Sequence, residues 1–255
     1  MDQRHAGKIA VISGAARGIG QAYATRLASE GADIVVTDIR PGDETVAKVN
    51  ALGRQAISVT CDVGDPAQVE ALGREVESAF GRCDILVNNA GLIPNQHFDD
   101  VSFEDWRRIM ATNLDAVFLM SKRFVPGMKT RGFGRIINIA SNTFGQMAPG
   151  LTHYIASKGG VVGFTRALAT DLGKFGITVN AIAPGLTRTP GTLELGDSYR
   201  GLPQEALYAA VAAKQAIPRQ QTPDDLVGTL SFLASADSGF MTGQTLYVDG
   251  GLVRV

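Results

Sequence analysis

The stretch Ser13-Gly14-Ala15-Ala16-Arg17-Gly18-Ile19-Gly20 decides the fold of this chain. It follows the apolar run Ile9–Ser13 and precedes a helical pattern that continues to Glu30. Three glycines at a strand-to-helix turn let the backbone approach a pyrophosphate, which the amides at the start of the helix can bind. The same glycine spacing also fits an ordinary turn, so the interpretation depends on the rest of the chain.

Outward from this turn, short β-branched runs alternate with longer helical patterns. The further runs are Asp33–Asp38, Ala56–Cys61, Ile85–Val87, Arg135–Ile139, Thr178–Ile182 and Thr245–Val248. Strands separated by helices of this length predict right-handed βαβ units and a parallel sheet with helices on both faces. Since the sequence has no linker, composition break or repeat, we expect one doubly wound, Rossmann-like α/β domain over residues 1–255. Its nucleotide half is roughly 1–100, and its catalytic and substrate half is roughly 101–255.

Composition narrows the function class. Apolar residues make up 45% and charged residues 19% of the 255 residues, which is ordinary for a globular protein with a sizeable core. The formal net charge is -1, and Lys and Arg do not cluster, so we expect no nucleic-acid or membrane partner. The N-terminus lacks the long apolar stretch of a secretory signal, and the two cysteines form no metal-ligand cluster. We therefore expect a cytoplasmic protein without a metal site.

The acid Asp38 ends the second predicted strand, where a carboxylate can bind both ribose hydroxyls and repel a 2′-phosphate. Alternatively, Asp38 is an ordinary turn residue that precedes Pro41. Arg17 and Arg40 favour the opposite cofactor, because either can pair with a 2′-phosphate. An ion pair at a partly solvated site contributes only about 0–1 kcal/mol. NAD is therefore favoured over NADP.

Several ordered motifs resemble the short-chain dehydrogenase/reductase family from Lys8 to the C-terminus. They are Cys61-Asp62-Val63, Asn88-Asn89-Ala90-Gly91, Asn113, Ser141, Tyr154-Ile155-Ala156-Ser157-Lys158, Pro184-Gly185 with Thr189, and Asp249-Gly250-Gly251. Ser13 replaces the commoner Thr of the glycine turn and keeps its hydroxyl. The resemblance implies a seven-stranded parallel sheet ordered 3-2-1-4-5-6-7 and a homotetramer.

The resemblance also implies cofactor contacts beyond the glycine turn. Asp62 and Val63 would hold the adenine, Asn89-Ala90-Gly91 would line the adenosine side, and Pro184-Gly185 with Thr187 and Thr189 would cover the nicotinamide. The cofactor-binding candidates of the turn itself are Ser13, Gly14, Arg17, Gly18, Ile19 and Gly20, with Asp38 from the next strand. Some segments are similar to those of 1-phenylethanol dehydrogenases, among them Thr152-His153-Tyr154, and others to those of pyridoxal 4-dehydrogenase, among them Asn142-Thr143-Phe144. These segments do not decide between the two.

Ser141, Tyr154 and Lys158 are the catalytic candidates. Tyr154 and Lys158 are four residues apart and share one face of a predicted helix, while Ser141 follows a strand at the ligand-binding edge of the sheet. Tyr154 can donate or accept the proton of a carbonyl/alcohol couple; since a free phenol has a pKa near 10, it needs a nearby cation such as the Lys158 ammonium. Ser141 can hydrogen-bond the substrate oxygen. Lys158 can also reach the ribose hydroxyls, and by resemblance Asn113 supports a water that links Lys158 to solvent.

The substrate candidates flank the tyrosine: Ile93, Asn142, Phe144, Met147, Leu193 and Tyr199. They are mostly apolar, and no pair of arginines is placed to clamp a substrate anion, so an uncharged, preferably aromatic alcohol or ketone is expected. A lid is predicted at about 189–217, with little polar anchoring and therefore mobile without ligand.

Two alternatives to an NAD-dependent alcohol dehydrogenase or ketone reductase remain open. One is a non-catalytic nucleotide-binding sensor with the same fold, which would have no use for Tyr154 and Lys158. The other is a carbonyl reductase that prefers NADP, because of the two arginines near Asp38.

Overall fold

The strands of the sheet lie close to their predicted positions. A computed structural model describes residues 3–146, 148–195 and 203–254. The strands are β1 (Ile9–Ser13), β2 (Asp33–Asp38), β3 (Ala56–Thr60), β4 (Ile85–Asn88), β5 (Gly134–Ile139), β6 (Ile177–Pro184) and β7 (Thr245–Val248). They form one parallel sheet in the order β3-β2-β1-β4-β5-β6-β7, which confirms the predicted order and the single Rossmann-like domain.

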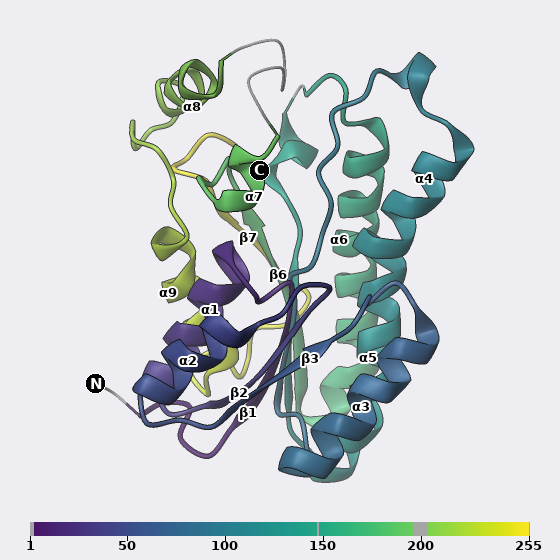
Figure 1. Cartoon of the computed structure of the whole chain (residues 1–255), viewed down its shortest axis with the longest axis vertical. Coiled ribbons are helices and arrows are strands. Elements are labelled where there is room, and N and C mark those ends of the chain that lie inside the picture. Colours follow the sequence, from purple (N-terminus) through teal and green to yellow (C-terminus); the bar gives the residue numbers. More distant parts are fainter. Residues whose placement is uncertain (1–2, 147, 196–202, 255) are drawn as a thin grey trace.

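Helices cover both faces of this sheet. They are α1 (Gly18–Ser29), α2 (Asp43–Ala51), α3 (Pro66–Phe80), α4 (Phe103–Met110), α5 (Ala116–Arg131), α6 (Thr152–Leu172), α7 (Pro190–Leu193), α8 (Gln204–Ala212) and α9 (Asp224–Ala234). Figure 1 shows α1, α2 and α9 on one face, α3 to α6 on the other, and α7 and α8 beyond the carboxyl ends of the strands. The two short helices therefore lie where α/β sheets bind their ligands.

The period of two along β1 divides its side chains between two core clusters, one on each face of the sheet. On β1, Val11 packs against the face covered by α3, α5 and α6, while Ala10 and Ile12 pack against the face covered by α1 and α9. All three side chains are fully buried, as expected of a parallel sheet with helices on both sides. Local signals start the helices: the Asp65 carboxylate accepts hydrogen bonds from the amides of Ala67 and Gln68 at the beginning of α3.

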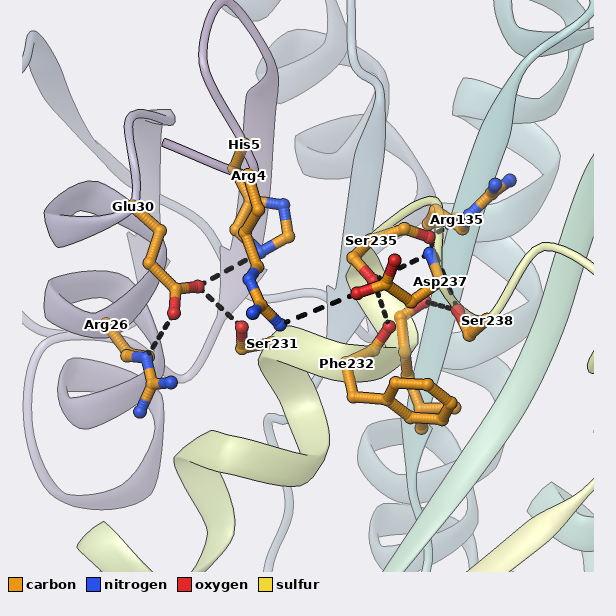
Figure 2. Close-up of polar contacts among 11 residues, drawn as sticks. Arg4, His5, Arg26, Glu30, Arg135, Ser231, Phe232, Ser235, Asp237 and Ser238 are labelled. Atoms are coloured by element: carbon orange, nitrogen blue, oxygen red, sulfur yellow. Dashed lines mark hydrogen bonds and ion pairs between the residues drawn. The ribbon is translucent and has the colours of Figure 1, made fainter. Parts of the chain in front are cut away.

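A buried polar network closes the amino end of the sheet (Figure 2). The Glu30 carboxylate accepts hydrogen bonds from Arg26 Nε at 2.8 Å and from Ser231 Oγ at 2.5 Å. His5 Nε2 lies 3.2 Å from the same carboxylate, and His5 is 1% exposed. These contacts join the N-terminal segment, α1 and α9 below the first strands. Burial lowers the pKa of His5, although Glu30 opposes the shift.

Candidate active site

A cleft of about 630 Å³ runs across the carboxyl ends of the strands. Its walls come from the glycine turn, from the ends of β2 to β6 and from the segment around α7. Most of the predicted cofactor-binding residues contribute to its lining, together with all three members of the Ser-Tyr-Lys set: Gly14, Arg17, Gly18, Ile19, Asp38, Asp62, Val63, Asn89, Ala90, Gly91, Ser141, Tyr154, Lys158, Pro184, Gly185, Thr187 and Thr189. The fold thus brings both predicted sets to one surface.

The glycine turn takes a conformation that other residues would strain. Gly14 and Gly18 have φ angles of 65° and 61°, in the left-handed region. A Cβ on Gly20 would lie 2.2 Å from the carbonyl oxygen of Gly14, so a side chain there would block the close contact between the turn and α1. At Gly14 and Gly18 the backbone therefore borders the cleft without an intervening side chain, as the close approach of a pyrophosphate requires.

Ser13 and Asn89 support the turn. Ser13 Oγ accepts hydrogen bonds from the amides of Asn89 and Ala90, at 3.0 and 3.1 Å. The Asn89 side-chain amide donates to the carbonyls of Ser13 and Gly14. These bonds tie the segment after β4 to the segment after β1. Ser13 is not among the cleft-lining residues, so the structure places it behind the binding surface.

Asp38 lies at the end of the cleft that the glycine turn forms. Its carboxylate accepts hydrogen bonds from the amides of Ala16 and Arg40, both at 3.1 Å, which fix its position beside the glycine turn. Asp62 Oδ1 accepts from the amide of Gly64 at 2.9 Å, and the neighbouring Val63 is buried. Asp38 and Asp62 therefore border the same cavity from the ends of two adjacent strands.

The Ser-Tyr-Lys set lies at the other end of the cleft. Tyr154 and Lys158 are on one face of α6, with Lys158 Nζ 6.0 Å from the centroid of the Tyr154 ring. Ser141 Oγ accepts hydrogen bonds from the amide and the hydroxyl of Thr143, at 3.2 and 2.9 Å. Because Ser141 Oγ acts as the acceptor in both, its own proton can be donated into the cleft.

Lys158 is buried but keeps a polar partner. Its ammonium donates to the carbonyl oxygen of Ile139 at 2.7 Å. Burial lowers the pKa of Lys158 to about 8, so the charged form still dominates at neutral pH. A Cβ on Gly91 would lie 3.4 Å from both Lys158 Nζ and Asn113 Oδ1, which places these groups together.

Asn113 sits in a π-helical segment, Ala111–Asp115, between α4 and α5. Its side chain exchanges hydrogen bonds with the backbone of Leu92 and donates to Ser157 Oγ at 3.1 Å. Asn113 therefore links the segment after β4 to α6 beside Lys158. Its predicted water-supporting role stays a prediction.

The predicted lid is better anchored than its sequence indicates. Thr189 and Thr192 form a capping box at α7, and the Tyr208 hydroxyl donates to Thr192 Oγ1 at 2.7 Å. Gln204 Nε2 donates to the carbonyl of Thr192, and Arg188 pairs with Glu205 at 2.6 Å. The expectation of little polar anchoring is therefore wrong. Two partners of Thr192, Gln204 and Tyr208, lie on α8, and sequence spacing does not reveal which helix will pack against α7.

The predicted substrate residues divide into three groups. Ile93 and Asn142 line the cleft, although the Asn142 side-chain amide also donates to Asp249 Oδ2 at 3.0 Å. Phe144 and Leu193 are absent from the lining; the Phe144 ring lies over Gly159 of α6 and is 55% exposed. Met147 and Tyr199 fall outside the described residues. Phe144 belongs to a short 3-10 helix, Asn142–Gly145, which directs its side chain outwards. The sequence pattern did not predict this helix.

The predicted substrate segments also contribute Leu195 of the lid, and Thr143 and Gln146 from the segment between Asn142 and Met147. The structure adds apolar cleft residues that the sequence did not single out, namely Leu92, Leu151, Leu186 and Val211. Arg108 and Glu194 add charge to the cleft. Arg108 belongs to α4, which precedes the catalytic motifs by a long stretch of sequence, so only the packing of α4 against α6 brings it there.

Within residues 3–146, 148–195 and 203–254, His, Cys, Asp and Glu side chains form no group of three suited to a metal ion. Among the same residues, every helix is too short or too polar to cross a membrane.

Comparison with known proteins identifies the family. A family profile described as enoyl-(acyl carrier protein) reductase matches residues 14–253. The hydroxy(phenyl)methylsuccinyl-CoA dehydrogenase subunit BbsD of Thauera aromatica is 41% identical over 246 residues, 96% of each chain. The 3-oxoacyl-(acyl-carrier-protein) reductase FabG of Haemophilus influenzae is 38% identical, over 96% of this chain and 98% of that protein. The chain belongs to the short-chain dehydrogenase/reductase family.

A solved structure agrees with this membership. The short-chain type dehydrogenase/reductase of Mycobacterium marinum superposes with a TM-score of 0.90 at 32% identity, over 98% of this chain and 97% of that one. The protein is thus an oxidoreductase of a family that uses nicotinamide cofactors. None of these relatives is a 1-phenylethanol or pyridoxal 4-dehydrogenase, so that finer resemblance stays a prediction.

Proposed function

We propose that this short-chain dehydrogenase/reductase is an NAD-dependent alcohol dehydrogenase or ketone reductase for uncharged, hydrophobic and preferably aromatic substrates. The observation that carries the proposal is one cleft with Asp38 at one end and Ser141, Tyr154 and Lys158 at the other. A sensor that only bound nucleotide would need the first end alone.

The cleft suits a nicotinamide dinucleotide. The glycine turn brings backbone to the border of the cleft, and Gly91, which has no side chain, lies between the cleft and the buried Lys158 and Asn113 side chains. Asp38 would bind the adenosine ribose and repel a 2′-phosphate, which favours NAD. Thr187 and Thr189 would border the nicotinamide, which when bound supplies or accepts the hydride.

The protein's own groups would handle the proton. In the reducing direction Tyr154 donates its hydroxyl proton to the carbonyl oxygen, and in the oxidising direction its oxygen takes that proton back. Ser141 donates a hydrogen bond to the same substrate oxygen as negative charge develops on it. The Lys158 ammonium stabilises the deprotonated form of Tyr154 from a buried position where its charge is weakly screened.

The substrate proposal rests on the apolar part of the lining. Ile93, Leu151, Leu186 and Leu195 line the same cleft as Tyr154. Burying a phenyl-sized group of roughly 150 Å² at about 25 cal/mol per Å² contributes about 4 kcal/mol before ordering costs. If half survives those costs, aryl substrates are favoured over small alkyl substrates by tens of fold.

A substrate panel tests this proposal. With purified enzyme and NAD, kcat/KM is measured for 1-phenylethanol, pyridoxal and 2-propanol through the absorbance of reduced nicotinamide. We expect at least one aromatic substrate to exceed 2-propanol by more than about tenfold. Equal values, or a clear preference for NADP over NAD, would contradict the proposal.

A second candidate substrate class is favoured by Arg108. Its side chain is 56% exposed and lines the cleft, while its guanidinium pairs with Asp105 at 3.1 Å. An exposed cation at the cleft could bind the phosphates of a coenzyme A or carrier-protein arm. The names of BbsD and FabG describe enzymes that act on such thioesters. Adding a 3-hydroxyacyl-CoA to the panel separates this class from free alcohols.

We also propose that the enzyme is a cytoplasmic homotetramer. An apolar groove over α5 and α6 supports the assembly, because exposed apolar surface of this kind is typical of subunit contacts; its lining includes Leu114, Phe118 and Phe164. Both cysteines, Cys61 and Cys83, are unpaired and buried, as in a reducing compartment. Light scattering coupled to size exclusion would measure the subunit number.

A further inference from the structure

Glu194, at the end of α7, connects the lid to the glycine turn. Its carboxylate accepts two parallel hydrogen bonds from the Arg17 guanidinium: one from Nη2 at 2.6 Å, and a second, shorter one from Nη1. Arg40 Nη2 lies 3.9 Å from the same carboxylate. Glu194 thus bridges two arginines that stand beside Asp38, and all four residues line the cleft.

The two arginines are the groups that would otherwise bind a 2′-phosphate. A guanidinium presents the same paired N–H donors to a carboxylate and to a phosphate. Asp38 marks the ribose position, and it lies close enough to Arg17 to help raise the pKa of that guanidinium after Glu194. A 2′-phosphate added to the ribose would therefore need the donors that Glu194 occupies, and it would meet a second carboxylate beside that of Asp38.

We propose that Glu194 is a specificity-determining residue whose carboxylate occupies the place of a 2′-phosphate on Arg17 and Arg40. With the lid in this position the cleft accepts NAD and rejects NADP. This inference rests on the proposed nicotinamide-dependent function and extends it. A residue far along the chain, in the lid, thereby competes with a 2′-phosphate for the two arginines near the ribose site.

Solvent exposure limits the strength of this contact. The side chains of Arg17, Arg40 and Glu194 are 28%, 51% and 57% exposed, so salt screens their interaction. The contribution of Glu194 to discrimination should accordingly fall as ionic strength rises. The part due to Asp38, which is held by two backbone amides, should fall less.

Calorimetric binding to the full-length enzyme tests the inference with two matched probes. Adenosine 2′,5′-bisphosphate carries the 2′-phosphate, and 5′-AMP lacks it. We expect Glu194→Gln to raise affinity for the bisphosphate at low salt by about five- to tenfold and to change affinity for 5′-AMP by less than about twofold. In the double variant Arg17→Ala with Glu194→Gln, the gain should largely disappear.

Glu70→Gln is the matched control, because the Glu70 carboxylate also lies between two arginines, Arg74 and Arg123, but stands on α3 and does not line the cleft. It should leave both affinities unchanged. An unchanged bisphosphate affinity in Glu194→Gln, or an equal gain in Glu70→Gln, would overturn the inference.

The binding assay also separates this inference from the proposed function. If the enzyme oxidises no alcohol or prefers NADP, while Glu194→Gln still gains affinity for the bisphosphate, the proposed function fails and the inference holds. If the enzyme is NAD-dependent and Glu194→Gln gains nothing, Asp38 alone sets the preference and the inference fails.

Discussion

At the amino end of the sheet the side chains of Arg26, Ser231 and His5 contact the Glu30 carboxylate. At the carboxyl end, by contrast, the Asp38 carboxylate borders an open cleft. Both acids are held by hydrogen bonds, but Glu30 is 6% exposed and its partners are side chains from three segments (Figure 2). Asp38 is held by two backbone amides of neighbouring loops. Glu30 therefore connects elements of the fold, while Asp38 is held at the border of the cleft.

Two buried tyrosines show the same difference between a residue at the cleft and a residue in the core. Tyr154 lines the cleft, while Tyr23 lies in the core between α1 and the sheet, and its hydroxyl finds no hydrogen-bond partner among the described residues. If the carboxyl end carries function and the amino end carries stability, substitutions at each end should affect different measurements.

The largest effect is expected for Tyr154→Phe. Removing the proposed proton donor should lower kcat at least about a hundredfold and leave NAD affinity near normal. Tyr23→Phe is the control, which should keep kcat and leave the protein as stable or more so, because it removes a buried, unpaired hydroxyl. Turnover of Tyr154→Phe within about fivefold of the parent would rule out the assignment.

Glu30→Gln should reverse this pattern. The substitution leaves Arg26 without its anionic partner and weakens the contacts to Ser231 and His5, so the free energy of unfolding should fall by about 2 kcal/mol. The kcat of the folded enzyme should stay within about twofold, as the site is at the opposite end of the strands. Urea unfolding and steady-state kinetics measure the two quantities. Glu75→Gln, an exposed change on α3, should alter stability by less than about 0.5 kcal/mol.

Asp38→Ala should act on cofactor choice. It removes both the ribose contact and the repulsion of a 2′-phosphate, so the ratio of kcat/KM for NAD over NADP should fall about tenfold, or about 1.4 kcal/mol. Asp43→Ala, exposed at the start of α2, should leave the ratio as it is. A preference for NADP in the unmodified enzyme would show that Arg17 and Arg40 outweigh Asp38.

The smallest expected effect is a pH dependence at the amino end. Burial lowers the pKa of His5 in the folded state, while Glu30 opposes this and Arg4 and Arg26 add to it. As the pH falls below the ordinary histidine pKa of about 6.5, the unfolded chain takes up a proton before the folded one does. Stability due to His5 is thus present above pH 6.5 and lost below it, by at most about 1 kcal/mol down to about pH 5.5.

His5→Gln should flatten this part of the stability profile, and His97→Gln, at an exposed position, should not. Chemical unfolding at a series of pH values compares the three proteins. An identical slope in the parent and in His5→Gln would show that other groups set the acid sensitivity.

Much of the fold followed from local sequence. Each strand lies within two residues of its predicted bounds, because β-branched runs and the turns that end them depend on near neighbours. The glycine turn likewise depends on backbone conformation at Gly14 and Gly18. The catalytic spacing of Tyr154 and Lys158 needs only one turn of helix. Parallel strands then bring Asp38 and Ser141 to the same edge of the sheet.

Only the tertiary structure decided the contacts between segments that lie far apart in the chain. Glu194 meets Arg17 across 177 residues, Arg108 reaches the cleft from α4, and Phe144 turns away from it. These placements depend on how helices pack and where a short 3-10 helix points a side chain, and no periodicity encodes either. By itself the sequence determined the glycine turn and the helical spacing of Tyr154 and Lys158. The packing of the lid against the glycine turn determined which charged side chains line the cleft there.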